Sequence, residues 1–139
     1  MTGIEAHTFA RDWIAAWNSH DLGAIMSHYA PEVVLTSPVA ARLLGDPSGT
    51  VAGKEALLGY FRRGLQVYPN LAFMLLEVMW GVSSIVLHYL NQNDIRCGEF
   101  MEVAAAPACP TPSWIIAPRA YAMMPIDERV RASTSVRRD

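Results

Sequence analysis

Apolar residues recur with a helical period at the start of the chain. Phe9, Trp13 and Trp17 follow one another at intervals of four residues, so they fall on one face of a helix. Thr2 and Glu5 precede this stripe at the spacing of a capping box, in which each side chain satisfies a free backbone N–H group. The pattern predicts a first helix that begins after Thr2.

A second helix and a short strand are predicted next. Asp21 can cap this helix, and Pro31 ends it because proline lacks the backbone N–H that a helix needs. Residues 33–36 have strand character and end before Pro38. The helix carries apolar side chains at positions i, i+3, i+4 and i+7, which are Leu22, Ile25, Met26 and Tyr29.

The pattern then passes from a loop through a helix to strands. Residues 38–52 are predicted as a long connection, of the kind that often forms the mouth of a pocket. Residues 57–65 place apolar side chains on one side of a third helix. Three runs of strand character follow, separated by turn residues: 71–80, 84–90 and 95–103. Helices followed by an antiparallel meander predict an α+β domain.

Composition and charge exclude several classes of protein. The 139 residues suffice for one domain, and 52% of them are hydrophobic. The net charge is −2 without a basic run, so neither nucleic acid nor an anionic membrane surface is an expected partner. No apolar run reaches the roughly 18 residues of a membrane helix, and the start lacks a signal-peptide pattern, so we expect a cytoplasmic protein. The histidines and cysteines lack metal-ligand spacings, so we expect neither a metal nor a cofactor.

Several blocks of the sequence resemble one superfamily. They are W-x-x-A-W-N-S-H-D-L, H-Y-A-P-E-V, G-K-E-A-L-L-G-Y-F, V-L-H-Y and E-F-M-E-V, in this order. Together they resemble the nuclear transport factor 2-like superfamily over roughly residues 7–103, and within it the SnoaL-like and ketosteroid-isomerase-like branch. The resemblance implies a cone-shaped fold, with N-terminal helices packed on a curved antiparallel sheet and a pocket between them. It also implies a homodimer formed through the outer face of the sheet.

The resemblance allows a test of one activity. Ketosteroid isomerases need a carboxylate base, a tyrosine and a protonated carboxylic acid. The tyrosine position looks like Trp13 in this chain, the base position like Ser37, and the position of the protonated acid like Glu99. Because a serine cannot act as that base at neutral pH, we do not expect a working ketosteroid isomerase.

Two residues are candidates for acid–base chemistry. Glu99 alternates with apolar or thiol side chains along its strand, so we expect it on a dry face where burial raises the pKa of a carboxyl. The alternative is a solvated or interface position, in which Glu99 pairs with Arg96. His88 is a candidate proton relay, and its alternative is a core or interface role. The expected ligand-binding residues are Trp13, Trp17, Tyr29, Ser37 and Met101, although the period by itself favours a core role for the two tryptophans.

The segment 104–139 departs from the family pattern. Five of the nine prolines fall between Pro107 and Pro125, a density that predicts no central strand there, so the final strand of the family is expected to be absent or altered. One interpretation is a shifted reading frame. Moving the codons of residues 114–116 back by one base gives an apolar residue, then Asp, then Tyr, His or Asn. The other interpretation is a divergent tail. We therefore divide the chain into a SnoaL-like domain, 1–103, and an atypical segment, 104–139.

Two classes of function remain open. The first is a cofactor-free acid–base enzyme of the isomerase, cyclase or dehydratase type, which acts on a small hydrophobic carbonyl or polycyclic compound through Glu99. The second is a non-catalytic ligand-binding or dimerisation module of the same fold, which Ser37 at the base position favours.

Overall fold

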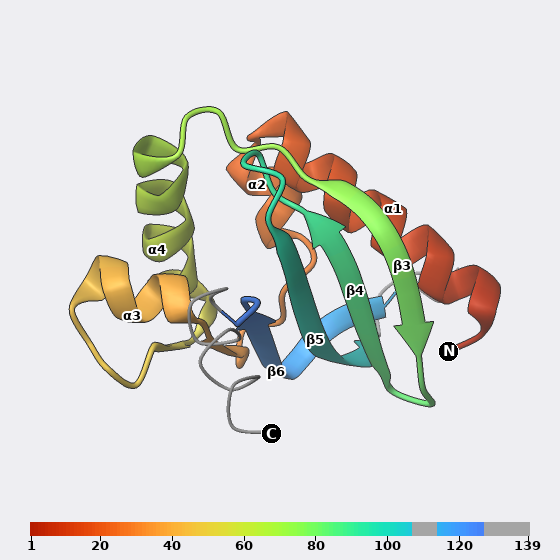
Figure 1. Cartoon of the computed structure of the whole chain (residues 1–139). Helices are drawn as coiled ribbons and strands as arrows, with labels where there is room; N and C mark the ends of the chain where they lie inside the picture. The colour runs from red at the N-terminus through yellow and green to blue at the C-terminus, as the bar shows by residue number, and fades with distance from the viewer. Residues whose placement is uncertain (107–113, 127–139) are drawn as a thin grey trace, which may run out of the picture.

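One six-stranded sheet and four helices form the computed structural model over the residues that it describes, 1–106 and 114–126 (Figure 1). The α+β class predicted from the sequence is confirmed. The elements in chain order are α1 Gly3–Ser19, α2 Leu22–Met26, β1 Val34–Thr36, α3 Pro38–Leu44, β2 Thr50–Ala52, α4 Lys54–Val67, β3 Met74–Trp80, β4 Ser84–Leu90, β5 Arg96–Ala105 and β6 Trp114–Met123.

Capping bonds fix the starts of the first two helices. The Thr2 N–H donates to the Glu5 carboxylate over 2.9 Å, and the Glu5 N–H donates to the Thr2 hydroxyl over 3.1 Å. The predicted capping box is therefore confirmed. Asp21 caps α2 by accepting two backbone N–H bonds. This helix is shorter than predicted, so Tyr29 lies beyond it and pairs with Ile116 in an isolated bridge.

The stretch 38–52 is more regular than predicted. The Ser37 hydroxyl caps α3 by accepting a backbone N–H bond of 3.2 Å, and Pro38 takes a first-turn position, where its missing N–H costs little. Gly45 ends the helix at a φ of 64°, which glycine adopts readily. Residues 50–52 then pair with β1 as the edge strand β2. The prediction of a plain loop was wrong because these elements are too short to show a period.

The strand order of the sheet is β2-β1-β6-β5-β4-β3. Strands β1 and β6 are parallel, and the other neighbouring pairs are antiparallel. Strand β6 therefore lies inside the sheet, between β1 and β5. The prediction that the proline-rich segment forms no central strand was wrong for residues 114–123. The prolines between 107 and 113 lie outside the described residues.

A bulge explains how β6 accommodates Pro118. The pairing between β5 and β6 shifts in register, so that Glu102 stands opposite residues 117–119. Proline is tolerated at a bulge because no ladder hydrogen bond is required from it there. The regular pairs on either side of this bulge are Met101 with Ala120 and Val103 with Ile116.

Helices α1, α2 and α4 meet the inner face of the sheet. Helix α1 packs along β3, and α2 packs against both α1 and α4 (Figure 1). Alternate residues of β4 point to this side, since Ile85, Leu87 and Tyr89 are buried while their neighbours are partly exposed. None of the helices in the described ranges is long and apolar enough to cross a membrane. The largest fully buried side chains are Trp13, Ile25, Val33, Leu57, Ile85, Leu87, Met101 and Ile116.

Candidate functional site

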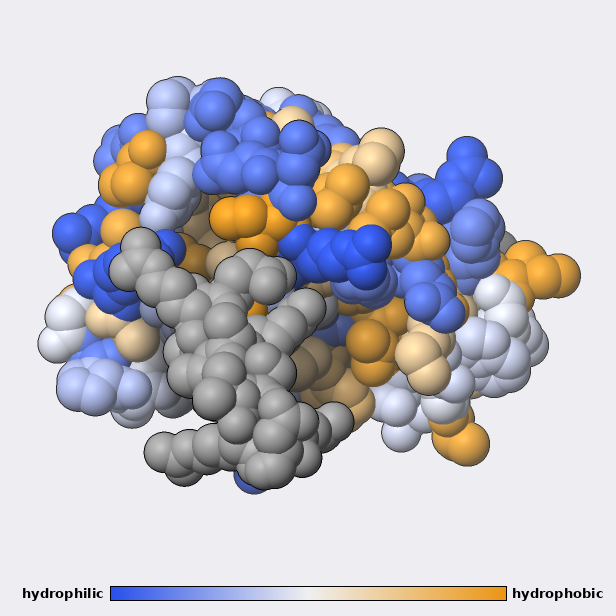
Figure 2. All heavy atoms as spheres, in the orientation of Figure 1, coloured by the Kyte–Doolittle hydropathy of each residue, from blue (hydrophilic) through white to orange (hydrophobic). Residues whose placement is uncertain are grey.

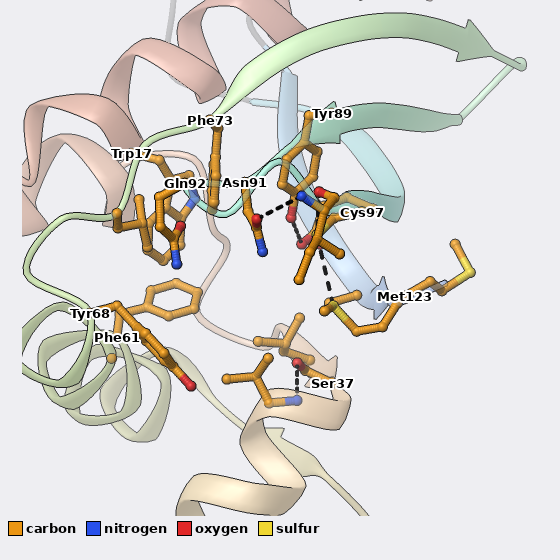
Figure 3. A pocket seen from close by; sticks show the side chains of 18 of the residues that line it. Trp17, Ser37, Phe61, Tyr68, Phe73, Tyr89, Asn91, Gln92, Cys97 and Met123 are labelled. Atoms are coloured by element: carbon orange, nitrogen blue, oxygen red, sulfur yellow. Dashed lines mark hydrogen bonds between the residues drawn. The ribbon is translucent and has the colours of Figure 1, made fainter. Parts of the chain in front are cut away.

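A cavity of about 360 Å³ lies between the helices and the inner face of the sheet (Figure 3). Helices α1 and α4 supply one side of it, and β4 and β5 supply the other. The turn between β4 and β5 and the start of α3 also line it. Eight aromatic side chains lie on the wall, which are Trp13, Trp17, Tyr29, Tyr60, Phe61, Tyr68, Phe73 and Tyr89.

Glu99 is the one carboxylic acid on the wall among the residues that the structure describes. It is 8% exposed, and the Tyr89 hydroxyl donates a 2.9 Å hydrogen bond to its Oε1 atom. Burial disfavours the charged form, and the Tyr89 bond offsets this only in part, so the pKa of Glu99 rises from 4.5 to about 8. At neutral pH, Glu99 is therefore a neutral acid that can donate a hydrogen bond.

The position of Glu99 decides between its two interpretations. Burial alternates along β5, and Arg96 lies on the exposed side while Glu99 and Cys97 point inward. An ion pair between Glu99 and Arg96 is thus excluded by the strand period. The dry environment expected for this carboxyl is observed.

The other ionisable groups beside Glu99 also stay protonated. Burial, followed by the nearby carboxyl of Glu99, raises the pKa of Tyr29 and of Tyr89 far above the ordinary value for a phenol. The same two causes raise the pKa of the Cys97 thiol to about 11. These groups are hydrogen-bond donors at neutral pH, so the inner part of the cavity is uncharged and suited to an acceptor oxygen.

The aromatic wall is held together by packing and by one buried hydrogen bond. The Trp13 ring stacks on Phe73 with a centroid distance of 5.9 Å and an interplanar angle of 14°. Its Nε1 donates to the Tyr29 hydroxyl over 3.1 Å. Because the Tyr29 oxygen accepts this bond, its own proton remains for another acceptor. Trp13 thus orients Tyr29 toward the cavity.

At the mouth, side chains from α3 and α4 approach each other. The Arg42 guanidinium donates a 3.3 Å hydrogen bond to the Tyr68 hydroxyl. Arg42 is the one cationic side chain on the wall within the described residues. Ser37 also reaches the wall, although its hydroxyl caps α3. In the described part of the chain, no three His, Cys, Asp or Glu side chains gather as metal ligands would.

The structure brings together five of the seven residues predicted for the site. These lie on the cavity wall, and they are Trp13, Trp17, Tyr29, Ser37 and Glu99. Met101 does not contact the cavity, because it is fully buried in the core on β5. His88 is on the opposite face of β4 from Tyr89, and it pairs with Gly98. A relay between His88 and Glu99 therefore has no support, since alternation along the strands puts them on different faces of the sheet.

Sequence reasoning missed several residues of the wall. Tyr89 is the most important, since it bonds Glu99 directly, and it follows His88 in the same apolar run. From the sequence, either face of that strand could point inward, because apolar residues occupy both faces. The register of β4 against β5 could have identified Tyr89. In this register Leu87 stands opposite Glu99, so Tyr89, two residues further along β4, lies on the same face of the sheet as Glu99. Cys97 shares the strand face of Glu99, whereas Tyr60 and Gln92 carry no comparable signal.

Comparisons with known proteins agree with this architecture. The sequence model of the SnoaL-like domain family matches residues 10–91. A SnoaL-like protein of unknown function from Burkholderia thailandensis has 34% sequence identity and a TM-score of 0.77, over 89% of this chain and 97% of that one. No curated protein matches the chain.

Two more distant structures share the fold alone. A candidate polyketide cyclase from Sinorhizobium meliloti has 12% identity and a TM-score of 0.65, over 88% of this chain and 100% of that one. A ketosteroid isomerase-like protein from Erwinia carotovora atroseptica has 19% identity and a TM-score of 0.54, over 88% of this chain and 96% of that one. The predicted resemblance to the SnoaL-like branch is confirmed by the family model and by the Burkholderia thailandensis structure.

Proposed function

The chain belongs to the SnoaL-like domain family, and from this premise we propose that it binds a small, largely apolar carbonyl compound and acts on it by cofactor-free acid–base chemistry. One observation carries the proposal. Among the described residues, the cavity wall holds a single buried carboxylic acid, Glu99, surrounded by aromatic rings and neutral donors. Such perturbed acids in clefts are typical of functional sites.

The size and lining of the cavity define the ligand. A volume of about 360 Å³ is near the lower end for small-molecule pockets, which suits one or two fused rings. The stacked rings of Trp13 and Phe73 offer flat apolar surfaces, and the neutral donors offer partners for an oxygen. A planar or nearly planar ketone meets both requirements.

Glu99 supplies the chemistry as a general acid. Since Tyr89 donates to Oε1, the acidic proton of Glu99 resides on Oε2. From there it is transferred to the carbonyl oxygen of the ligand while a water molecule takes a proton from the adjacent carbon. The carbon–hydrogen bonding pair becomes the C=C bond of an enol, and the carboxylate regains its proton from solvent. General acid catalysis of this kind accelerates reactions by roughly 10² to 10⁴.

Solvent deuterium exchange tests this proposal without knowledge of the natural substrate. The probe is β-tetralone, a bicyclic ketone with acidic protons beside its carbonyl, followed by NMR in heavy water. We expect Glu99→Gln to bind the ketone with similar affinity but to lose exchange by about 10² or more. The matched control is Glu102→Gln, on the same strand but facing away from the cavity, which retains full exchange.

A second candidate is a binding module without catalysis. Ser37 at the position expected for a base favours it, because the only other acid–base groups on the described wall are Glu99, tyrosines, the Cys97 thiol and Arg42. This function predicts that β-tetralone binds and that wild type and Glu99→Gln exchange its protons at the same slow rate. The same experiment therefore separates the two functions.

A homodimer through the sheet belongs to the same proposal. Strand β3 carries exposed apolar side chains, including Met79 at 61% and Trp80 at 52%. On the face seen in Figure 2, hydrophobic side chains gather over the region in which Figure 1 draws β3 and β4. Such patches are typical of interfaces. Light scattering of the purified protein tests this, with twice the chain mass of 15.3 kDa as the expected result and the chain mass as the contrary one.

A further inference from the structure

Two buried polar atoms of the cavity wall have no hydrogen-bond partner in the described residues. They are the Nε1 donor of Trp17 and the Oε1 acceptor of Gln92. Trp17 is 8% exposed, so water does not reach its indole freely from outside. A buried donor or acceptor without a partner costs about 1–3 kcal/mol, so native proteins rarely keep such groups on a cavity wall without a use.

Packing fixes the Trp17 ring, so the indole cannot turn away to find a partner. Its ring meets Phe61 edge to face at a centroid distance of 4.7 Å and also contacts Phe73 at 5.9 Å. The Trp17 N–H lies near the Tyr29 hydroxyl and lowers the pKa of that group, but the two do not form a regular hydrogen bond. Trp13 already donates to this hydroxyl, so the Trp17 donor remains for an incoming group.

Gln92 approaches the cavity from a different element. It lies in the turn between β4 and β5, and its Oε1 atom is buried although the turn itself is at the surface. Figure 3 draws Trp17 and Gln92 on one side of the cavity and Cys97, two residues before Glu99 on β5, on the other. The cavity therefore has a second polar place away from Glu99.

A hydroxyl group matches the chemistry of this second place. It accepts one hydrogen bond, as the indole N–H requires, and donates one, as the amide oxygen requires. A purely apolar ligand leaves both groups unmatched.

We propose that Trp17 and Gln92 form a recognition site for a hydroxyl group at the end of the ligand remote from its carbonyl. This inference rests on the proposed function, since it takes the carbonyl to lie at Glu99. It narrows the substrate class to rigid bicyclic or aromatic ketones that carry a second oxygen at the opposite end. Trp17 and Gln92 act as specificity-determining residues, with no part in the proton transfer.

Three probes and two variants test the inference by calorimetric titration. The probes are β-tetralone, its phenol with a hydroxyl at the far end of the aromatic ring, and the methyl ether of that phenol. Wild type should bind the phenol roughly tenfold more tightly than β-tetralone. Trp17→Phe, which removes the N–H and keeps the ring, should weaken the phenol and the ether by roughly three- to tenfold while β-tetralone changes less than about twofold.

Gln92→Met gives an independent result, because Gln92 lies in a turn far in sequence from Trp17. The substitution removes the amide and keeps the length of the side chain. It should weaken the phenol alone, since the ether has no proton to donate to Gln92. Equal effects on all three probes, or none on the phenol, would overturn the inference. If β-tetralone binds and the phenol binds no tighter, this inference fails and the proposed function stands. If none of the three ketones binds, the proposed function fails as well.

Discussion

Because Glu99 keeps its proton in the folded protein, the free energy of unfolding should fall as the pH rises. The pKa of this carboxyl is about 8 in the folded state and 4.5 as its ordinary value. Between these two values the folded protein holds a proton that the unfolded chain has released. Stability rises with pH only where the unfolded state binds more protons, so here it falls. The stability that the protonated Glu99 contributes is fully present below pH 4.5 and is lost as the pH rises through 8.

The size of this effect follows from the pKa difference. One pKa unit corresponds to about 1.4 kcal/mol, so the free energy of unfolding should drop by about 3–4 kcal/mol between pH 5 and pH 8. Glu99→Gln is neutral in both states at every pH and should abolish this slope. The Cys97 thiol does not interfere in this interval, because its pKa is raised to about 11.

Urea unfolding at pH 5, 6, 7 and 8, followed by circular dichroism, measures this slope. The comparison is between wild type, Glu99→Gln and the control Glu102→Gln, which should keep the wild-type slope because it lies on the other face of β5. Equal slopes for wild type and Glu99→Gln, or a wild-type stability that increases with pH, would refute the reasoning. Either result would mean that Glu99 is ionised in the folded protein.

Three further predictions concern single contacts. Tyr89→Phe should raise the pKa of Glu99 further, because the Tyr89 hydrogen bond lowers it, and an NMR titration of the carboxyl checks this. Ser37→Ala should cost about 0.5–2 kcal/mol in urea unfolding through the lost cap of α3, whereas a larger loss would imply more than capping. Leu57→Ala should cost about 2–5 kcal/mol in the same assay, because Leu57 is 0% exposed in the core.

The sequence predicted those features that depend on local periods and caps. The capping box of Thr2 and Glu5 and the two-residue period of β5 both act over a few neighbouring residues, so they can be read from one segment. The period of β5 put Glu99 on the apolar face of the strand but left a solvated or interface position open, and the structure shows that Glu99 is buried. The aromatic stripe of α1 identified Trp13 and Trp17, whose double use as core and cavity wall needs the fold around them.

Other features depend on segments that are distant in sequence. Strand β6 exists because β1 and β5 satisfy its backbone, and Pro118 is harmless only because of a bulge against Glu102. The phase of β4 depends on the helices that cover one face of it, so Tyr89 was overlooked in favour of His88. Met101 was predicted on the cavity wall, but it is buried in the core and does not line the cavity. The position of these residues depends on the segments packed against them, which the local sequence pattern does not show.

The shifted-frame hypothesis for residues 104–139 stays a prediction. Sequencing the gene across codon 104 and translating the other frames provides the test. An alternating apolar strand in another frame supports the hypothesis, while its absence in every frame leaves a divergent tail. The strand β6 does not decide between them, because a strand is compatible with either origin.

The proposed function requires that Glu99 is neutral in the folded protein at neutral pH, and its pKa can be measured. The carboxyl carbon of Glu99 can be followed by NMR through a pH titration of the labelled protein, with Glu99→Gln to assign the signal. We expect a midpoint near 8, well above the ordinary value of 4.5. A midpoint at or below 4.5 would show a solvated or ion-paired carboxylate, and it would contradict the proposed acid in the cavity.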